Sequence, residues 1–139
     1  MPQIDENDVR VVEDDSPIQY FVSSCLTVTC GFSDGSRIGA HFSHGPNDRV
    51  GTYGTSVMTW GVFKDAVANK VRTSGGATWV IVRGQTDMWK PEYLTTRRLT
   101  ADTATSGNLS DTISKVTGRA PNIQAQNGSI VVMADGALV

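Results

Sequence analysis

The sequence is short of the features that mark most specialised protein classes. Its 139 residues include only two cysteines, five prolines and 7% aromatic residues, and its net charge is −2. Two cysteines cannot build a disulfide framework, and these two do not have the usual spacing of metal ligands. The 12 basic residues are scattered rather than gathered in a stripe. We therefore expect no metal site and no nucleic-acid partner.

Long apolar runs are also missing, so we expect no membrane insertion. The N-terminus is acidic and polar and does not resemble a conventional signal peptide. We expect a cytoplasmic protein, or one delivered into a target cell by a route that needs no such signal. Cys25 and Cys30 are expected to be free thiols on opposite sides of one strand.

The residues that are present indicate one globular domain. Hydrophobic residues make up 39% of the chain, with 14 glycines and three tryptophans. Residues 1–15 are rich in acidic side chains, and we expect them to be a mobile or edge segment preceding a single domain of residues 16–139. Oligomeric state cannot be inferred from these features.

Hydrophobic periodicity predicts a layered α+β fold, with a mostly antiparallel sheet or sandwich flanked by two helices. A turn over residues 33–36 is expected to pair the strand before it with the strand after it. Asn127-Gly128 is a strong turn signal and predicts a second hairpin. The expected strands are residues 18–22, 26–32, 37–43 and 77–82, the expected helices are residues 56–73 and 108–117, and the second hairpin is residues 124–133.

The first of these hairpins brings together a cysteine and a histidine. Cys25 lies eight residues before Ser33 and His41 eight residues after it, so the two are expected to be close across adjacent strands. A thiol attacks an amide only as a thiolate, which a neighbouring base can generate. Cys25 is therefore the candidate nucleophile and His41 the candidate base.

Three nearby polar residues are candidates for supporting roles. Ser24 precedes Cys25, and the backbone there could stabilise an oxyanion. Gln19 and Ser23 are candidates for the group that orients the imidazole. The alternative for each of these residues is structural, because a cysteine in a strand is more often a small core residue. Cys30 is interpreted in that way, and His44 as a loop residue.

A resemblance to a known family adds to this interpretation. Residues 22–29 (Val-Ser-Ser-Cys-Leu-Thr-Val-Thr), followed by Ala40-His41-Phe42, resemble the signature of the CheD chemoreceptor glutamine deamidases. The similarity continues at residues 63–66, 75–77 and 117–119 and covers about residues 20–134. The Ser24-Cys25 pair also resembles the motif of deamidase toxins related to cytotoxic necrotizing factor and the Burkholderia lethal factor. The resemblance implies a shared fold, with Cys25 as nucleophile and His41 as base.

The resemblance implies a cofactor-free hydrolase that converts a glutamine of a partner protein to glutamate through a thioester. CheD enzymes usually carry threonine six residues before the cysteine, where this chain has Gln19. We therefore favour a divergent, effector-like member over a CheD-type chemoreceptor enzyme, with an inactive binding module of the same fold, or a related cysteine activity, as alternatives. Tyr53, Met88 and Trp89, in the loops 45–55 and 83–92, are candidates for a substrate-recognising rim, although Trp89 could equally pack over the sheet.

Overall fold

The computed structural model describes residues 2–43, 52–89 and 108–139, and this part of the chain is α+β. Its strands are β1 (Asp8–Val12), β2 (Ile18–Val22), β3 (Leu26–Gly31), β4 (Arg37–Phe42), β5 (Trp79–Gly84), β6 (Asn122–Ala125) and β7 (Gly128–Val132). Its helices are α1 (Thr52–Ser74), the 3-10 helix η1 (Thr86–Met88) and α3 (Leu109–Thr117).

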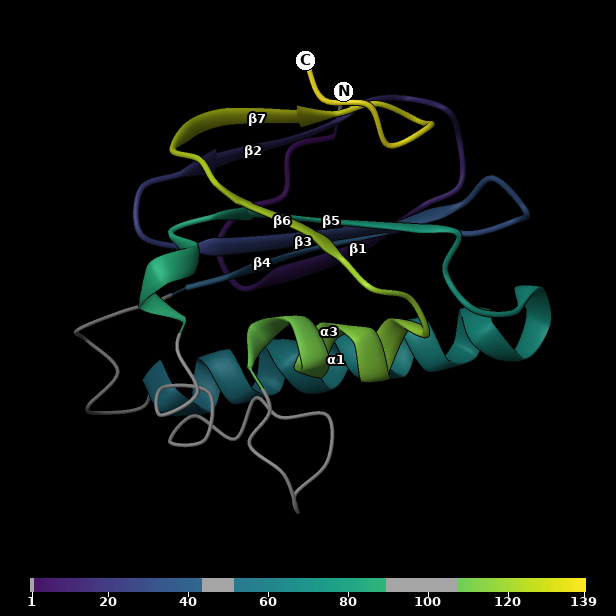
Figure 1. Cartoon of the computed structure of the whole chain (residues 1–139), viewed down its shortest axis with the longest axis horizontal. Coiled ribbons are helices and arrows are strands. Elements are labelled where there is room, and N and C mark those ends of the chain that lie inside the picture. The colour runs from purple at the N-terminus through teal and green to yellow at the C-terminus, as the bar shows by residue number, and fades with distance from the viewer. Residues whose placement is uncertain (1, 44–51, 90–107) are drawn as a thin grey trace.

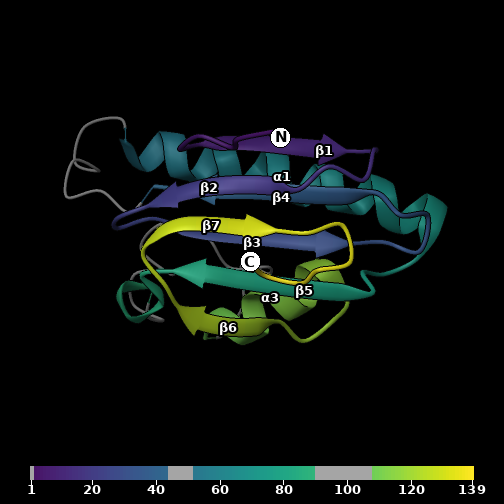
Figure 2. The same cartoon turned by 90° about the horizontal axis from the view of Figure 1, so that it is seen from above.

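These elements form three layers (Figure 1). The middle layer is a five-stranded sheet of order β1-β4-β3-β5-β6, antiparallel except where β5 pairs with β6. Helices α1 and α3 cover one face of this sheet, and the two-stranded sheet of β2 and β7 covers the other. Seen from above, β2 and β7 lie over the middle of the large sheet (Figure 2).

The central hairpin confirms the sequence prediction. β3 and β4 pair antiparallel, with Thr27 opposite His41 and Gly31 opposite Arg37. Gly35 in the connecting turn has a φ of +85°, a conformation that glycine adopts without steric cost. Every residue of both strands is buried, because each strand has a packed layer on both sides.

Alternation along β3 divides the core into two clusters. Leu26, Val28 and Cys30 face the helices, where α1 contributes Trp60, Phe63 and Val67. The opposite face carries Thr27 and Thr29, and the Thr29 hydroxyl lies 2.7 Å from the hydroxyl of Tyr20 on β2. A smaller apolar cluster lies between the two sheets and contains Ile4, Val12, Ile18, Tyr20, Val22, Cys25, Ile130 and Val132.

Both helices are present, and the largest boundary difference is at the start of α1. The structure begins α1 at Thr52 rather than at residue 56 and ends it at Ser74. Helix α3 matches the prediction: the Asn108 side chain accepts a hydrogen bond from the backbone N–H of Asp111, and Gly118 ends the helix with a φ of +81°. Both helices lie on one face of the large sheet, rather than on opposite faces.

The predicted second hairpin is wrong. β6 ends at Ala125 and β7 begins at Gly128, but β6 pairs with β5 in the large sheet and β7 pairs with β2 in the small one. The chain therefore passes from one sheet to the other between these two strands. The physical reason is burial, because Ile130 and Val132 on β7 complete the small apolar cluster.

The acidic N-terminal segment forms the edge of the large sheet. β1 pairs along its whole length with β4, from Asp8 opposite His41 to Val12 opposite Arg37. Before it, Gln3 forms an isolated bridge with Gln19 of β2. Of the two expectations for this segment, the structure places residues 8–12 in an edge strand rather than a mobile tail.

One exposed carboxylate joins the β3–β4 turn to the end of α1. Asp34 accepts hydrogen bonds from the backbone and hydroxyl of Ser36 on one oxygen and from Lys70 and Ser74 on the other. Hydrogen bonds from Ser36 are the main reason why the pKa of Asp34 lies below its ordinary value.

Asp34→Asn is expected to lower the free energy of unfolding at pH 7, and the difference from wild type is expected to shrink in acid. The folded pKa of Asp34 is depressed, so its contribution is present above the unfolded pKa of about 4 and is lost as pH falls below it. Urea unfolding at pH 7 and about pH 2.5 measures both values. Asp65→Asn, at an exposed position of α1, is the control, and a pH-independent deficit in Asp34→Asn would contradict the prediction.

Candidate functional site

Cys25 and His41 lie on the same face of the large sheet. Cys25 immediately precedes β3, and Thr27, two residues later, pairs with His41 on β4. Side chains two residues apart on a strand share a face, as do directly paired residues. Cys25 also packs in the same small cluster as Tyr20, whose ring meets the His41 ring edge-on at a centroid distance of 5.9 Å. The two residues are thus diagonal neighbours between the sheets.

The Cys25 thiol is buried but lies directly beneath an exposed side chain. Only 1% of Cys25 is exposed, and its Sγ donates a hydrogen bond to the Glu6 carboxylate at 3.1 Å. Glu6 itself is exposed. Its carboxylate therefore separates the sulfur from solvent at this point.

The hydrogen bonds of His41 determine which ring nitrogen can act as a base. Nδ1 lies 2.8 Å from the backbone oxygen of Ile4. Because a carbonyl oxygen only accepts, Nδ1 must carry the proton, and the neutral ring then keeps its lone pair on Nε2. Nε2 is buried and has no hydrogen-bond partner in the described part of the chain. The geometry leaves Nε2 available to accept a proton.

The same face of the sheet carries buried positive charge. Arg37 lies opposite Gly31 on β3, and Arg83 of β5 lies opposite Thr27. Both guanidinium groups donate to backbone oxygens, and none of the ion pairs formed by described residues involves either of them. Burial lowers the pKa of Arg83 below its usual value. Arg37 lies at the turn end of β3, the end opposite Cys25, and the Arg83 guanidinium donates to the Asn122 carbonyl of β6.

The structure does not bring the side chain of Gln19, one of the three predicted supporting residues, to the site. Gln19 alternates with the buried Ile18 and Tyr20, so its side chain points to the outer face of β2, where its amide donates to Ser129 at 3.2 Å. That direction is away from His41, and the prediction that Gln19 orients the imidazole is wrong for this structure. Ser23 is exposed, and Ser24 is half-buried beside Cys25 in the chain.

The residues that contact the pair instead come from the N-terminal segment. The Ile4 carbonyl orients His41, and Glu6 contacts the Cys25 thiol. Sequence reasoning missed both, because they approach Cys25 and His41 from 19 and 37 residues away. A burial signal was present for Ile4, which is the first large apolar residue after Met1 in an otherwise polar segment.

Part of the predicted substrate rim lies outside the residues that the structure describes. Residues 44–51 and 90–107, which include most of the loop 45–55 and the end of the loop 83–92, lie outside the described residues, as do the side chains of Tyr53 and Met88. Trp89 is 2% exposed and packs against Phe42 at a ring-centroid distance of 6.4 Å. It belongs to the helix-side core, so it does not form a rim beside Cys25.

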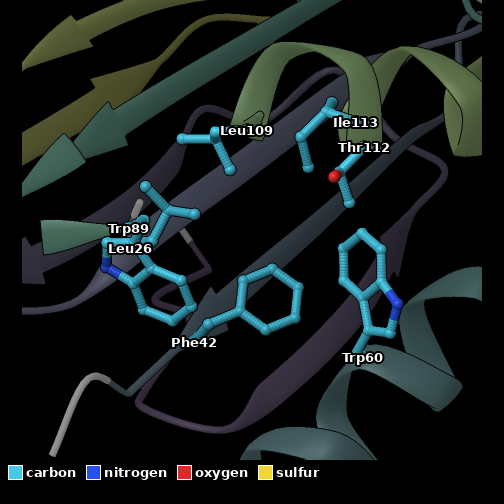
Figure 3. A pocket seen from close by; sticks show the side chains of 7 residues that line it. All are labelled: Leu26, Phe42, Trp60, Trp89, Leu109, Thr112 and Ile113. Carbon is cyan, nitrogen blue, oxygen red and sulfur yellow. The ribbon is translucent and has the colours of Figure 1, made fainter. Parts of the chain in front are cut away.

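Trp89 lines an apolar pocket on that helix side (Figure 3). Phe42 lies at its centre, between the indole rings of Trp60 and Trp89, and α3 closes it from the other side. The lining residues are Leu26, Phe42, Trp60, Trp89, Leu109, Thr112 and Ile113. This pocket lies across the large sheet from Cys25, so the two features are separate.

Cys30 differs from Cys25 in its surroundings. It is fully buried in the helix-side core, its Sγ contacts the Ile38 carbonyl oxygen at 3.7 Å, and burial raises the pKa of its thiol to about 12. A thiol of this kind stays protonated and unreactive at neutral pH. Neither cysteine takes part in a disulfide.

No group of three or more histidine, cysteine, aspartate or glutamate side chains capable of holding a metal occurs in the described ranges. Helices able to span a bilayer are likewise not found there. Comparison with protein-family models, curated proteins and solved structures finds no match to this chain.

Proposed function

We propose that the chain is a protein-glutamine deamidase with a CheD-like fold, in which Cys25 is the nucleophile and His41 the general base. The observation that carries the proposal is the shared sheet face of the two side chains, with Nδ1 of His41 held by the Ile4 carbonyl so that Nε2 keeps its lone pair. Nucleophile, base and a group that orients the base are the elements of cysteine-dependent acyl transfer.

The proposed reaction consumes one water and releases one ammonia. Nε2 of His41 takes the thiol proton, and the Cys25 sulfur attacks the carboxamide carbon of the substrate glutamine. The C–N bond then breaks as the leaving nitrogen takes the proton from His41, which leaves a thioester. Nε2 next removes a proton from water, whose oxygen attacks the thioester carbon and breaks the C–S bond. The products are a glutamate side chain and regenerated Cys25.

The consequence for a target protein is electrostatic. A neutral amide with two N–H donors becomes a carboxylate that only accepts. Loss of a hydrogen bond at a buried or paired position costs about 1–3 kcal/mol, which is enough to switch an interaction surface. The proposed partner is therefore a protein whose glutamine takes part in such an interaction.

Intact-mass measurement of candidate partner proteins tests the proposal. Wild-type protein is expected to add about 1 Da per converted glutamine, whereas Cys25→Ala adds none, because the thioester cannot form. Cys30→Ala is the matched control and is expected to retain full activity, since Cys30 lies on the opposite face of β3. Equal mass gain with Cys25→Ala would contradict the assignment of the nucleophile.

The burial of Cys25 favours one alternative, a binding module of the same fold without activity. In that case the thiol is a core residue and the Cys25–Glu6 contact is structural. Ammonia release that depends on Cys25 and needs no added amine would exclude the binding module and also separate deamidation from transglutamination.

A further inference from the structure

The Cys25 thiol is covered by a side chain that has the chemistry of the proposed product. A deamidase converts glutamine to glutamate, and the group hydrogen bonded to the Cys25 sulfur, 3.1 Å away, is the carboxylate of a glutamate, Glu6. Carboxylate and carboxamide groups have nearly the same shape and differ in one non-hydrogen atom, an oxygen in place of the amide nitrogen. The position of the Glu6 carboxylate is thus one that a glutamine carboxamide could occupy, with its oxygen within hydrogen-bond distance of the sulfur.

Glu6 is held at this position by backbone hydrogen bonds of residues before and after it in the chain. On one side, Ile4 is fully buried, its N–H donates to the Gln19 carbonyl at 2.9 Å, and its own carbonyl accepts from His41. On the other side, the N–H of Asn7 donates to the backbone oxygen of His41 at 2.6 Å. Two backbone contacts to the candidate base therefore flank the residue that contacts the candidate nucleophile.

The side chain of Asn7 adds a second contact between this segment and the end of β4. Its Oδ1 accepts a hydrogen bond from the hydroxyl of Ser43, at the end of β4, at 3.0 Å. The backbone of Asn7 has a φ of +61°, within a turn that is closed by a hydrogen bond from the N–H of Asp8 to the carbonyl of Asp5. Glu6 is the second residue of that turn and is presented on its exposed side.

We propose, on the basis of the proposed deamidase activity, that Glu6 is a built-in product mimic that occupies the carboxamide position of the active site. Its carboxylate accepts a hydrogen bond from the thiol but repels a thiolate, so it holds Cys25 in the unreactive form. The Glu6 side chain is exposed and can leave without disturbing Ile4, so the orientation of His41 is kept. The substrate is then a glutamine on an exposed turn of a partner protein, which takes the place of Glu6.

Glu6→Gln in the full-length chain tests this assignment directly, because it turns the product mimic into an intramolecular substrate. The variant is expected to convert the introduced glutamine to glutamate, with a mass gain of about 1 Da that returns it to the wild-type mass. Fragmentation of the N-terminal peptide locates the change at position 6 and separates it from reaction at the neighbouring Asn7. Glu6→Gln combined with Cys25→Ala is expected to stay unconverted.

Glu13→Gln is the matched control for non-specific deamidation. Glu13 belongs to the same acidic segment, and its side chain is 76% exposed beside Lys70. Its glutamine variant is expected to stay unconverted. Conversion of both variants at equal rates would overturn the assignment of Glu6 to the carboxamide position.

The rate at which iodoacetamide labels Cys25 provides a readout that does not need catalysis. Glu6→Ala is expected to raise this rate by about tenfold or more over wild type, since it removes the carboxylate that covers and repels the thiolate. An unchanged rate in Glu6→Ala would overturn the proposal that Glu6 restrains the thiol.

The experiments separate this inference from the proposed function. If wild-type protein deamidates a partner through Cys25 but Glu6→Gln is not self-converted, the product-mimic assignment fails and the deamidase proposal stands. If Glu6→Gln stays unconverted and no protein gains mass in a Cys25-dependent way, both fail. Cys25-dependent self-conversion of the Glu6→Gln variant alone would support both.

Discussion

Replacing His41 by asparagine is expected to lower the rate of deamidation by a factor of about 10²–10⁴, the usual contribution of a general base. Asparagine can still donate a hydrogen bond from its amide toward the Ile4 carbonyl, which His41 contacts through Nδ1. It has no counterpart to Nε2, which accepts the proton in the proposed mechanism. The rate is measured as ammonia release or as mass gain on the target protein.

His44→Asn is the matched control for this prediction. It replaces the other of the two histidines in the chain, at a position outside the described residues, and it is expected to keep the wild-type rate. Urea unfolding of both variants reports whether the His41 substitution disturbs the core between the sheets. A folded His41→Asn protein with the wild-type rate would show that His41 is not the base.

Gly84→Ala is expected to destabilise the protein by about 2–5 kcal/mol, the sum of backbone strain and overpacking. Gly84 has a φ of +131°, and an added Cβ would lie 2.2 Å from the backbone oxygen of Cys25. That carbonyl also accepts a hydrogen bond from the N–H of Gln85 at 3.0 Å. The substitution therefore forces the backbone of the candidate nucleophile to move. Chemical denaturation and the deamidation rate should both report the change.

Gly35→Ala separates the two causes. Gly35 also has a positive φ, of +85°, but an added Cβ meets nothing within 4 Å. Only the strain of the left-handed conformation remains, which costs about 1–2 kcal/mol. Gly35→Ala is expected to leave the deamidation rate unchanged, because the turn lies at the opposite end of β3 from Cys25. Equal losses of stability in the two variants would contradict the steric explanation for Gly84.

The sequence predicts those elements whose partners are close in the chain. The β3–β4 hairpin has strong alternation and a short turn, and its predicted pairing is confirmed. Helix α3 carries its own start and stop signals at Asn108 and Gly118. For such elements local chemistry and tertiary packing agree, so pattern reasoning succeeds.

Elements with distant partners are predicted less well. The Asn127-Gly128 signal is real, since Gly128 has a φ of +83°, but a turn signal does not decide which sheet accepts the next strand. Helix α1 has apolar residues on two neighbouring faces, so the sequence pattern does not determine which face is buried. In the structure Phe63 and Val67 are buried, while Val62 is 55% exposed. Long-range burial decides both cases.

The candidate site also combines residues that the sequence predicts with residues that depend on distant contacts. The sequence places Cys25 and His41 near each other because one hairpin carries both. The alternation of apolar residues in β2 also indicates that Gln19 faces outward, since Ile18, Tyr20 and Val22 share the opposite, buried face. Glu6 and the Ile4 carbonyl could not be predicted, because their positions depend on how the N-terminal segment packs against β2 and β4.

The pairing of β2 with β7 has a consequence for synthesis on the ribosome. β2 ends at residue 22, and β7 is completed only at residue 132. The two-stranded sheet that covers Cys25 therefore cannot form until residue 132 has left the ribosome. Such distant pairing is slow to form. A nascent chain would therefore leave the apolar cluster around Cys25 incompletely covered throughout the synthesis of these residues.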